Sequence, residues 1–135
     1  MTTRAQIIAA AFARIGVADY EFDVTPDERA SARRKLDGMM ARWEGEGVDL
    51  DYTPSADNND AVAMTTPAYA DEPIIDNLAL RLAPDFGKTP SPDLKATARS
   101  GYSLLLAKGL NIPTAARSHT PVRGGGDRYY RYWGW

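Results

Sequence analysis

The acidic side chains of this sequence are its first candidates for chemistry, because carboxylates bind metal ions and catalyse hydrolysis. Asp49 and Asp51 are spaced like the start of a calcium-binding loop, and Asp57 and Asp60 follow them. However, Pro54 stands where such a loop needs a glycine for its sharp turn, and Asp60 replaces the bidentate glutamate. We therefore expect a solvated acidic loop here, with no bound metal and no cofactor.

Two pairs of neighbouring carboxylates could act as the acid and the base of a hydrolase: Glu44 with Glu46, and Asp71 with Glu72. General acid catalysis needs one carboxyl group with a raised pKa in a cleft, and the sequence marks neither pair as buried. The glycine-rich Gly124–Gly126 lacks the flanking strand and helix of a nucleotide-binding loop. No nucleophile–base set accompanies these groups, so the sequence predicts that the protein is not an enzyme.

The C-terminal residues combine aromatic and basic side chains in a way that indicates a protein interface. Residues 111–135 hold four arginines and one aspartate, and five of the chain's 13 aromatic residues occupy the last seven positions. Tyrosine, tryptophan and arginine are enriched at interface hot spots, whereas this small positive excess is weak for phosphate binding. Stacking on single-stranded nucleic acid is the alternative. The predicted interface consists of Arg117, Arg123, Arg128, Tyr129, Tyr130, Arg131, Tyr132, Trp133 and Trp135.

Composition places the chain in an ordinary class of globular proteins. Its 135 residues are 44% hydrophobic and 25% charged, with a formal net charge of −2, which suits one domain and excludes a wholly disordered chain. The absence of cysteine excludes disulfides and thiol chemistry, and the single His119 cannot supply a multi-histidine metal site. No uncharged run approaches the length of a membrane span, so we expect a soluble protein.

Four helices are expected to position these side chains, because apolar residues recur three and four positions apart. The helices should cover about Thr3–Ile15, from Thr25 to about Gly45, from Asp71 to Pro84, and from Ser91 to Gly109. Their expected buried residues are Ile8, Ala11, Phe12 and Ile15; Ala32, Leu36, Met39, Met40 and Trp43; Ile75, Leu78, Ala79 and Leu82; and Leu94, Ala98, Tyr102 and Leu105.

The remaining segments complete the predicted architecture. Thr25 and Glu28 match a capping box, which is a strong helix start. The connection over residues 45–69 is long, so it should be a working arm or disordered, with a short strand possible over Val48–Tyr52. We predict an all-α fold: a small four-helix bundle domain over residues 1–109 and an extended C-terminal arm over residues 110–135.

Four stretches of the sequence resemble a known family. Residues 36–48, with their Met-Met-Ala-Arg-Trp run, and residues 75–87, with Asn-Leu-Ala-Leu-Arg-Leu-Ala-Pro-Asp, are the most distinctive. Residues 7–17 and 98–108 also match. The chain resembles the head-to-tail adaptor proteins of short-tailed phages, also called tail accessory factors or packaged-DNA stabilisation proteins.

This resemblance implies a structural virion protein of the phage neck, made in the host cytoplasm. Copies would bind the portal protein as a ring, usually of twelve, and extend the DNA channel. They would retain the packaged DNA without sequence-specific binding, and offer a platform to the next tail component, a nozzle, hub or needle. No membrane partner is implied. The alternatives are a peptidoglycan-degrading virion enzyme and a small DNA-binding helical module.

Overall fold

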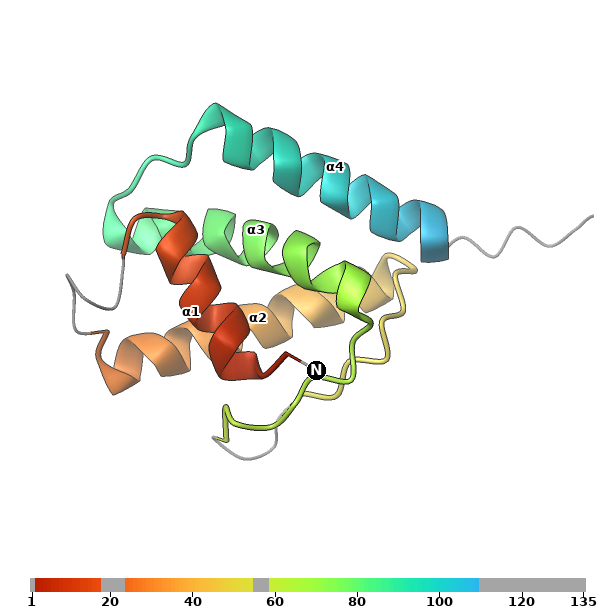
Figure 1. Ribbon diagram of the computed structural model, residues 1–135, viewed down its shortest axis with the longest axis horizontal. Coiled ribbons are helices and arrows are strands. Elements are labelled where there is room, and N and C mark those ends of the chain that lie inside the picture. Colours follow the sequence, from red (N-terminus) through yellow and green to blue (C-terminus); the bar gives the residue numbers. More distant parts are fainter. Residues whose placement is uncertain (1, 18–23, 55–58, 110–135) are drawn as a thin grey trace, which may run out of the picture.

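The computed structural model describes residues 2–17, 24–54 and 59–109, which form a bundle of α-helices (Figure 1). The helices are α1 (Arg4–Arg14), α2 (Pro26–Gly45), α3 (Asp71–Leu82) and α4 (Pro92–Gly109). Two short 3-10 helices, Ala68–Ala70 and Ala83–Phe86, flank α3. These described residues contain no β-strand, and the predicted all-α bundle is confirmed.

Polar side chains cap the starts of three of the four described helices, and the predicted capping box at Thr25 and Glu28 is confirmed. The Thr25 hydroxyl accepts a hydrogen bond from the Glu28 amide at 3.3 Å, and the Glu28 carboxylate accepts one from the Thr25 amide at 2.8 Å. Thr3 and Gln6 form the same reciprocal pair at the start of α1, and the Ser91 hydroxyl caps α4. Each cap gives a partner to amides that a helix start otherwise leaves without one.

Helix α3 lies at the centre of the bundle and contacts all three other helices (Figure 1). The apolar side chains predicted on α2 are all buried, which confirms that stripe. On α3, however, Ile74 is fully buried, whereas the predicted Ile75 is only partly buried. Because α3 packs against neighbours on several sides, its buried surface is wider than one stripe. Ile15 and Tyr102, also predicted as core, pack partly buried against the core.

The connection between α2 and the first 3-10 helix is not a free arm, because its described residues pack on the bundle. Val48, Leu50 and Met64 are all buried in the hydrophobic core. The predicted strand over Val48–Tyr52 is wrong: in the described part of the chain, no segment pairs with it. Its alternating apolar side chains serve the helical core instead, and a period of two cannot distinguish these outcomes.

The beginning of the chain is held against this connection and against α3. Thr3 and Ala63 form an isolated antiparallel bridge, and the Met64 amide donates to the Thr2 carbonyl at 2.9 Å. The Thr2 hydroxyl also donates a hydrogen bond to the Asp71 carboxylate. The N-terminus therefore joins segments about 60 to 70 positions apart in sequence. None of the described helices is long and apolar enough to cross a membrane.

Candidate functional site

A groove of about 550 Å³ lies between the second half of α2 and the segment that follows it, residues 48–54. Its lining residues are Asp37, Gly38, Met40, Ala41, Glu44, Val48, Asp49, Leu50, Asp51, Tyr52 and Pro54. Met40, Val48 and Leu50 are buried, so they give the groove a hydrophobic floor. Four carboxylates share the lining, and we call this feature the acidic groove.

Tyr52 fixes one wall of the acidic groove. Its hydroxyl donates a hydrogen bond to the Asp37 carboxylate on α2. The Arg4 guanidinium lies 5.4 Å from the centre of the Tyr52 ring, and its Nη2 donates to the Thr53 carbonyl at 2.8 Å. Burial raises the pKa of the Tyr52 hydroxyl, and the hydrogen bond to Asp37 raises that pKa further. The raised pKa favours the protonated hydroxyl that donates this bond.

The other three carboxylates of the acidic groove, on Glu44, Asp49 and Asp51, are exposed. The Asp49 carboxylate accepts a hydrogen bond from the Asp51 amide at 3.0 Å. Asp51 has a positive φ of 54°, a left-handed conformation that aspartate adopts more readily than most residues. Its carbonyl accepts a hydrogen bond from the Thr65 hydroxyl, which holds this turn in place.

Glu44 and Glu46, the first predicted carboxylate pair, lie in different surroundings. Glu44 lines the acidic groove, whereas Glu46 binds Arg42 at 2.7 Å and accepts a hydrogen bond from the Tyr102 hydroxyl. The Tyr102 bond, followed by the Arg42 bond, lowers the pKa of Glu46. A carboxyl group with a lowered pKa is a poor general acid at neutral pH, so Glu46 does not suit that role.

The second predicted pair, Asp71 and Glu72, lies at the start of α3, and both carboxylates contact other side chains of the bundle. Asp71 accepts a hydrogen bond from Thr2, and Glu72 lies 3.4 Å from the Arg14 guanidinium with a largely exposed side chain. Both carboxylates lie in the first turn of α3, where negative charge stabilises the helix dipole. These contacts explain Asp71 and Glu72 as structural residues.

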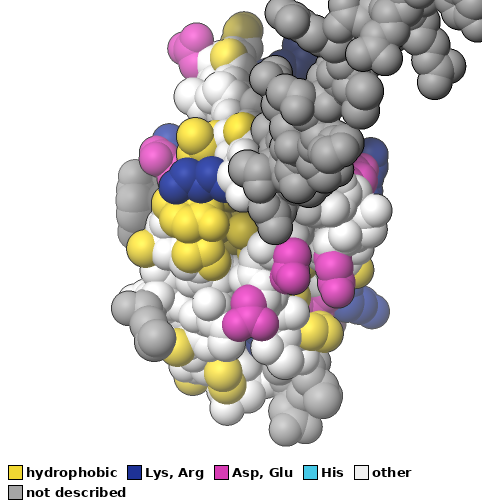
Figure 2. All heavy atoms as spheres, turned by 90° about the vertical axis from the view of Figure 1, so that its right-hand side faces the viewer, with side chains coloured by type: hydrophobic (Ala, Val, Ile, Leu, Met, Phe, Trp, Pro, Cys, Tyr) yellow, Lys and Arg dark blue, Asp and Glu magenta, His cyan; other side chains and the backbone are white. Residues whose placement is uncertain are grey.

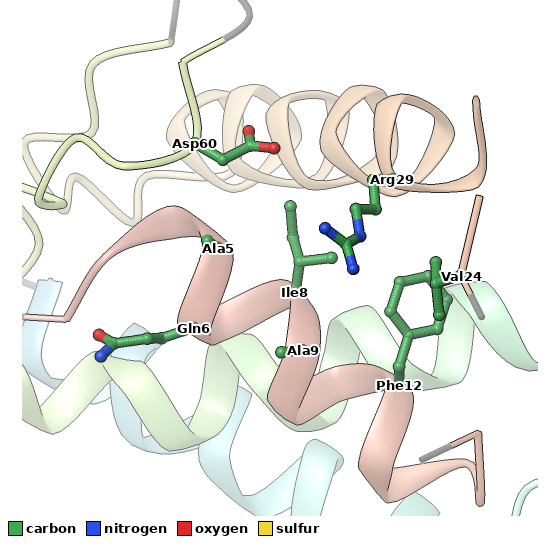
Figure 3. A pocket seen from close by; sticks show the side chains of 8 residues that line it. All are labelled: Ala5, Gln6, Ile8, Ala9, Phe12, Val24, Arg29 and Asp60. Atoms are coloured by element: carbon green, nitrogen blue, oxygen red, sulfur yellow. The ribbon is translucent and has the colours of Figure 1, made fainter. Parts of the chain in front are cut away.

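A second pocket, of about 350 Å³, opens between α1 and the beginning of α2 (Figure 3). Its lining residues are Ala5, Gln6, Ile8, Ala9, Phe12, Val24, Arg29 and Asp60. Asp60 binds Arg33 through two contacts of 2.5 and 2.7 Å, and the Arg29 guanidinium points toward Ile8 and Phe12 (Figure 3). This pocket suits an apolar side chain, and its one carboxylate is already paired. The predicted loop residue Asp57 lies outside the described residues.

The end of α4 carries a further cluster of exposed side chains. Lys108 Nζ lies 3.9 Å from the centre of the Tyr69 ring, which is a cation–π distance. Tyr69 is 44% exposed, and Leu104, one turn before Lys108, is 48% exposed. Hydrophobic, basic and acidic side chains lie close together on this end of the molecule (Figure 2).

The predicted protein interface lies entirely outside the described residues, so it stays a prediction. Its members are Arg117, Arg123, Arg128, Tyr129, Tyr130, Arg131, Tyr132, Trp133 and Trp135. The division into a bundle over residues 1–109 and an arm over residues 110–135 likewise stays a prediction. Within the described ranges, no three His, Cys, Asp or Glu side chains lie close enough together to hold a metal ion.

A small four-helix body with the Met-Met-Ala-Arg-Trp and Ala-Pro-Asp stretches is the kind of protein that the sequence resemblance indicates. The family model of the P22 tail accessory factor matches residues 1–135. The chain belongs to this family of phage tail proteins, and it is therefore a virion-associated protein with a structural role in the tail. The predicted family is confirmed.

One relative carries an enzyme's name. The chain is 28% identical over 132 residues to peptidoglycan hydrolase gp27 of Acyrthosiphon pisum secondary endosymbiont phage 1. The matched region covers 94% of this chain and 82% of that protein. This finding contradicts the prediction that the protein is not an enzyme, and that prediction is wrong. The prediction considered pairs of carboxylates that are close in sequence, such as Glu44 with Glu46. The acidic groove instead brings together carboxylates from two separate segments.

Sequence reasoning missed the pairing of Asp37 with Tyr52, which shapes the acidic groove. Asp37 belongs to the polar face of α2, and a polar face ordinarily indicates exposure to solvent. The available signal was the alternation of Val48, Leu50 and Tyr52, which places these three side chains on one side of an extended segment. That alternation predicts an inward direction for Tyr52, but it does not identify the partner.

Proposed function

We propose that this protein is a head-to-tail adaptor that binds beneath the portal of a short-tailed phage. Membership of the tail accessory factor family over the whole chain is the observation that carries this proposal. In this role a ring of copies, twelve in number, extends the DNA channel and retains the packaged genome. The ring offers its lower surface to the next tail component.

Residues 124–135, the last part of the predicted C-terminal arm, are the proposed portal anchor, because their side chains suit a protein interface. The tyrosines and tryptophans of residues 129–135 would bury large areas at low entropic cost, and such residues dominate interface energies. Arg128 and Arg131 would pair with carboxylates on the portal and set the register more than the affinity. In a ring, neighbouring arms bind at high effective concentration, so a modest gain per copy is multiplied.

Deletion of residues 124–135 tests this proposal. We expect the truncated protein to keep the helical circular dichroism spectrum of the full chain and to lose stable attachment to purified portal in sedimentation. A chain with Arg128→Gln and Arg131→Gln is the control, and it should still attach because the aromatic anchors remain. Normal decoration of portals by the truncated protein, in particles that keep their DNA, would overturn the proposed anchor.

Peptidoglycan hydrolysis is the second candidate function, favoured by the name of the relative and by the acidic groove. Glycosidic bonds are cleaved by two carboxyl groups that flank the bond, one as the acid and the other as the base or nucleophile. Glu44 from α2 and Asp49 from the following segment line the same groove without an ion-pair partner among the described residues. They are therefore the residues that we assign to this activity.

The hydrolase candidate predicts release of reducing sugar ends from purified peptidoglycan by the full chain. Glu44→Gln and Asp49→Asn should each lower that release by at least about 100-fold, which is typical for loss of acid–base catalysis. Glu72→Gln, at an exposed carboxylate outside the groove, is the matched control and should leave the rate unchanged. An inactive full chain, or full activity in both groove variants, would remove the assignment.

A further inference from the structure

The acidic groove holds carboxylates that the bundle itself does not neutralise. Within the described ranges, Glu44, Asp49 and Asp51 have neither a cationic partner nor a place in the first turn of a helix. The other described acidic side chains bind a cation or a hydroxyl group, or they lie at a helix start. Three negative charges therefore surround a hydrophobic floor at one place on the surface.

The chain leaves α4 directly beside this groove. A Cβ atom built on Gly109, the last residue of α4, would lie 3.0 Å from the Gly47 carbonyl and 3.6 Å from the Val48 Cα. Val48 is itself a lining residue of the acidic groove. Gly109 therefore lies against the backbone at one edge of the groove, and a Cβ atom at this position would be tighter than an ordinary contact.

The sequence that follows complements the groove in both charge and hydrophobicity. Residues 110–123 contain Arg117 and Arg123 and no acidic residue, together with Leu110, Ile112 and Val122. The lining carboxylates of α2 extend from position 37 to position 44, about 10 Å at 1.5 Å per residue. Fourteen residues reach about 46 Å when extended, so the segment can lie along the whole groove.

We propose that residues 110–123 dock in the acidic groove of their own chain, with Arg117 and Arg123 facing Glu44, Asp49 and Asp51. Attachment at Gly109 keeps the segment at high effective concentration beside the groove, which favours the same chain over a second copy. The distal residues 124–135 take no part in this contact. The proposal is therefore independent of portal attachment. A glycan would have to displace residues 110–123 before it could enter the groove.

Disulfide trapping tests the proposal in the full chain, which contains no cysteine of its own. Ala41→Cys lies in the groove and is paired with Ser118→Cys, whereas the control pairs Ser118→Cys with Ala96→Cys on the exposed surface of α4. We expect an intramolecular disulfide at least about tenfold faster from position 41 than from position 96, because docking raises effective concentration. The difference should disappear in 1 M salt, where the Debye length is about 3 Å.

Charge reversal distinguishes docking from chance contact. Arg117→Glu with Arg123→Glu should abolish the excess rate, and adding Glu44→Lys with Asp49→Lys should restore it; circular dichroism checks that each variant folds. Equal rates from positions 41 and 96, or no effect of the reversed charges, would overturn the proposal. Disulfide-linked dimers in place of the intramolecular product would show that the segment docks on a second copy, and this result would also overturn the proposal.

Discussion

At the scale of single residues, the contact between Tyr102 and Glu46 makes the clearest prediction. The Tyr102 hydroxyl donates to the Glu46 carboxylate, and this bond is the main reason for the lowered pKa of Glu46. Tyr102→Phe removes this hydrogen bond and should raise the pKa of Glu46 toward the ordinary glutamate value. The Phe ring would still pack beside Trp43, so the variant changes little else. Titration of the side-chain carboxyl carbon by NMR measures this shift.

The sign of the stability effect follows from the direction of that shift. A carboxyl group whose pKa is lower in the folded state stabilises the fold above its unfolded pKa and loses this effect as pH falls through the folded value. The stability difference between the wild type and Tyr102→Phe should therefore shrink under acidic conditions. Tyr69→Phe is the control, because Tyr69 contacts Lys108 and leaves Glu46 untouched. An unchanged Glu46 titration in Tyr102→Phe would contradict the prediction.

Residue-scale features were predictable where the partner is close in sequence. Thr25 and Glu28 are three positions apart, so their capping box can be recognised from spacing alone. Asp37 and Tyr52 are 15 positions apart across a helix end and a turn, and no local pattern relates them. The acidic groove depends on such pairs. Sequence reasoning therefore identified Glu44, Asp49 and Asp51 as candidates, but it found neither Asp37 nor the arrangement of the four carboxylates.

At the scale of elements, the capping box of α2 should contribute measurably to stability. Thr25→Ala removes the hydroxyl that accepts from the Glu28 amide and should lower the free energy of unfolding by about 1 kcal/mol. Thr89→Ala, in the exposed connection before α4, is the matched control and should change it by less than about 0.5 kcal/mol. Urea unfolding followed by circular dichroism measures both, and equal losses would contradict the assigned cap.

The central position of α3 predicts a contrast between two leucines. Leu78 on α3 is fully buried, and Leu78→Ala should cost about 2–5 kcal/mol through lost burial and the cavity that remains. Leu104 on α4 is 48% exposed, and Leu104→Ala should cost far less. Thermal unfolding of the two variants provides the comparison, and a similar loss in both would place the centre of the core elsewhere.

Helix bounds were largely predictable, whereas the path of the connection was not. The prolines and caps at Pro26, Ser91 and Pro92 define helix starts through local chemistry, which the sequence displays directly. Burial of Val48 and Met64 depends on how the helices leave space for them, and that is a property of the assembled bundle. Turn-forming residues therefore predict a working arm or disorder over residues 45–69, and the packing of this segment becomes visible only in the assembled bundle.

At the scale of the whole molecule, we predict that the isolated protein is a monomer and forms a ring only on its partner. Among the described residues, the large exposed hydrophobic side chains are Val62, Tyr69 and Leu104. Tyr69 and Leu104 belong to the cluster at the end of α4, and three such side chains are too few for the large contiguous apolar patch that marks an interaction site. Analytical ultracentrifugation at micromolar concentration should give a species near 14.8 kDa, and a stable ring without portal would contradict this.

The position of α3 also has a consequence for the order in which the chain becomes structured during synthesis. Helix α1 packs mainly on α3 and only lightly on α2, although α2 follows it directly in the chain (Figure 1). The ribosome adds about 5–20 residues per second, so α3 is completed several seconds after α1. Throughout that interval the apolar side of α1 lacks its main partner. The nascent protein therefore acquires its core late, when α3 emerges.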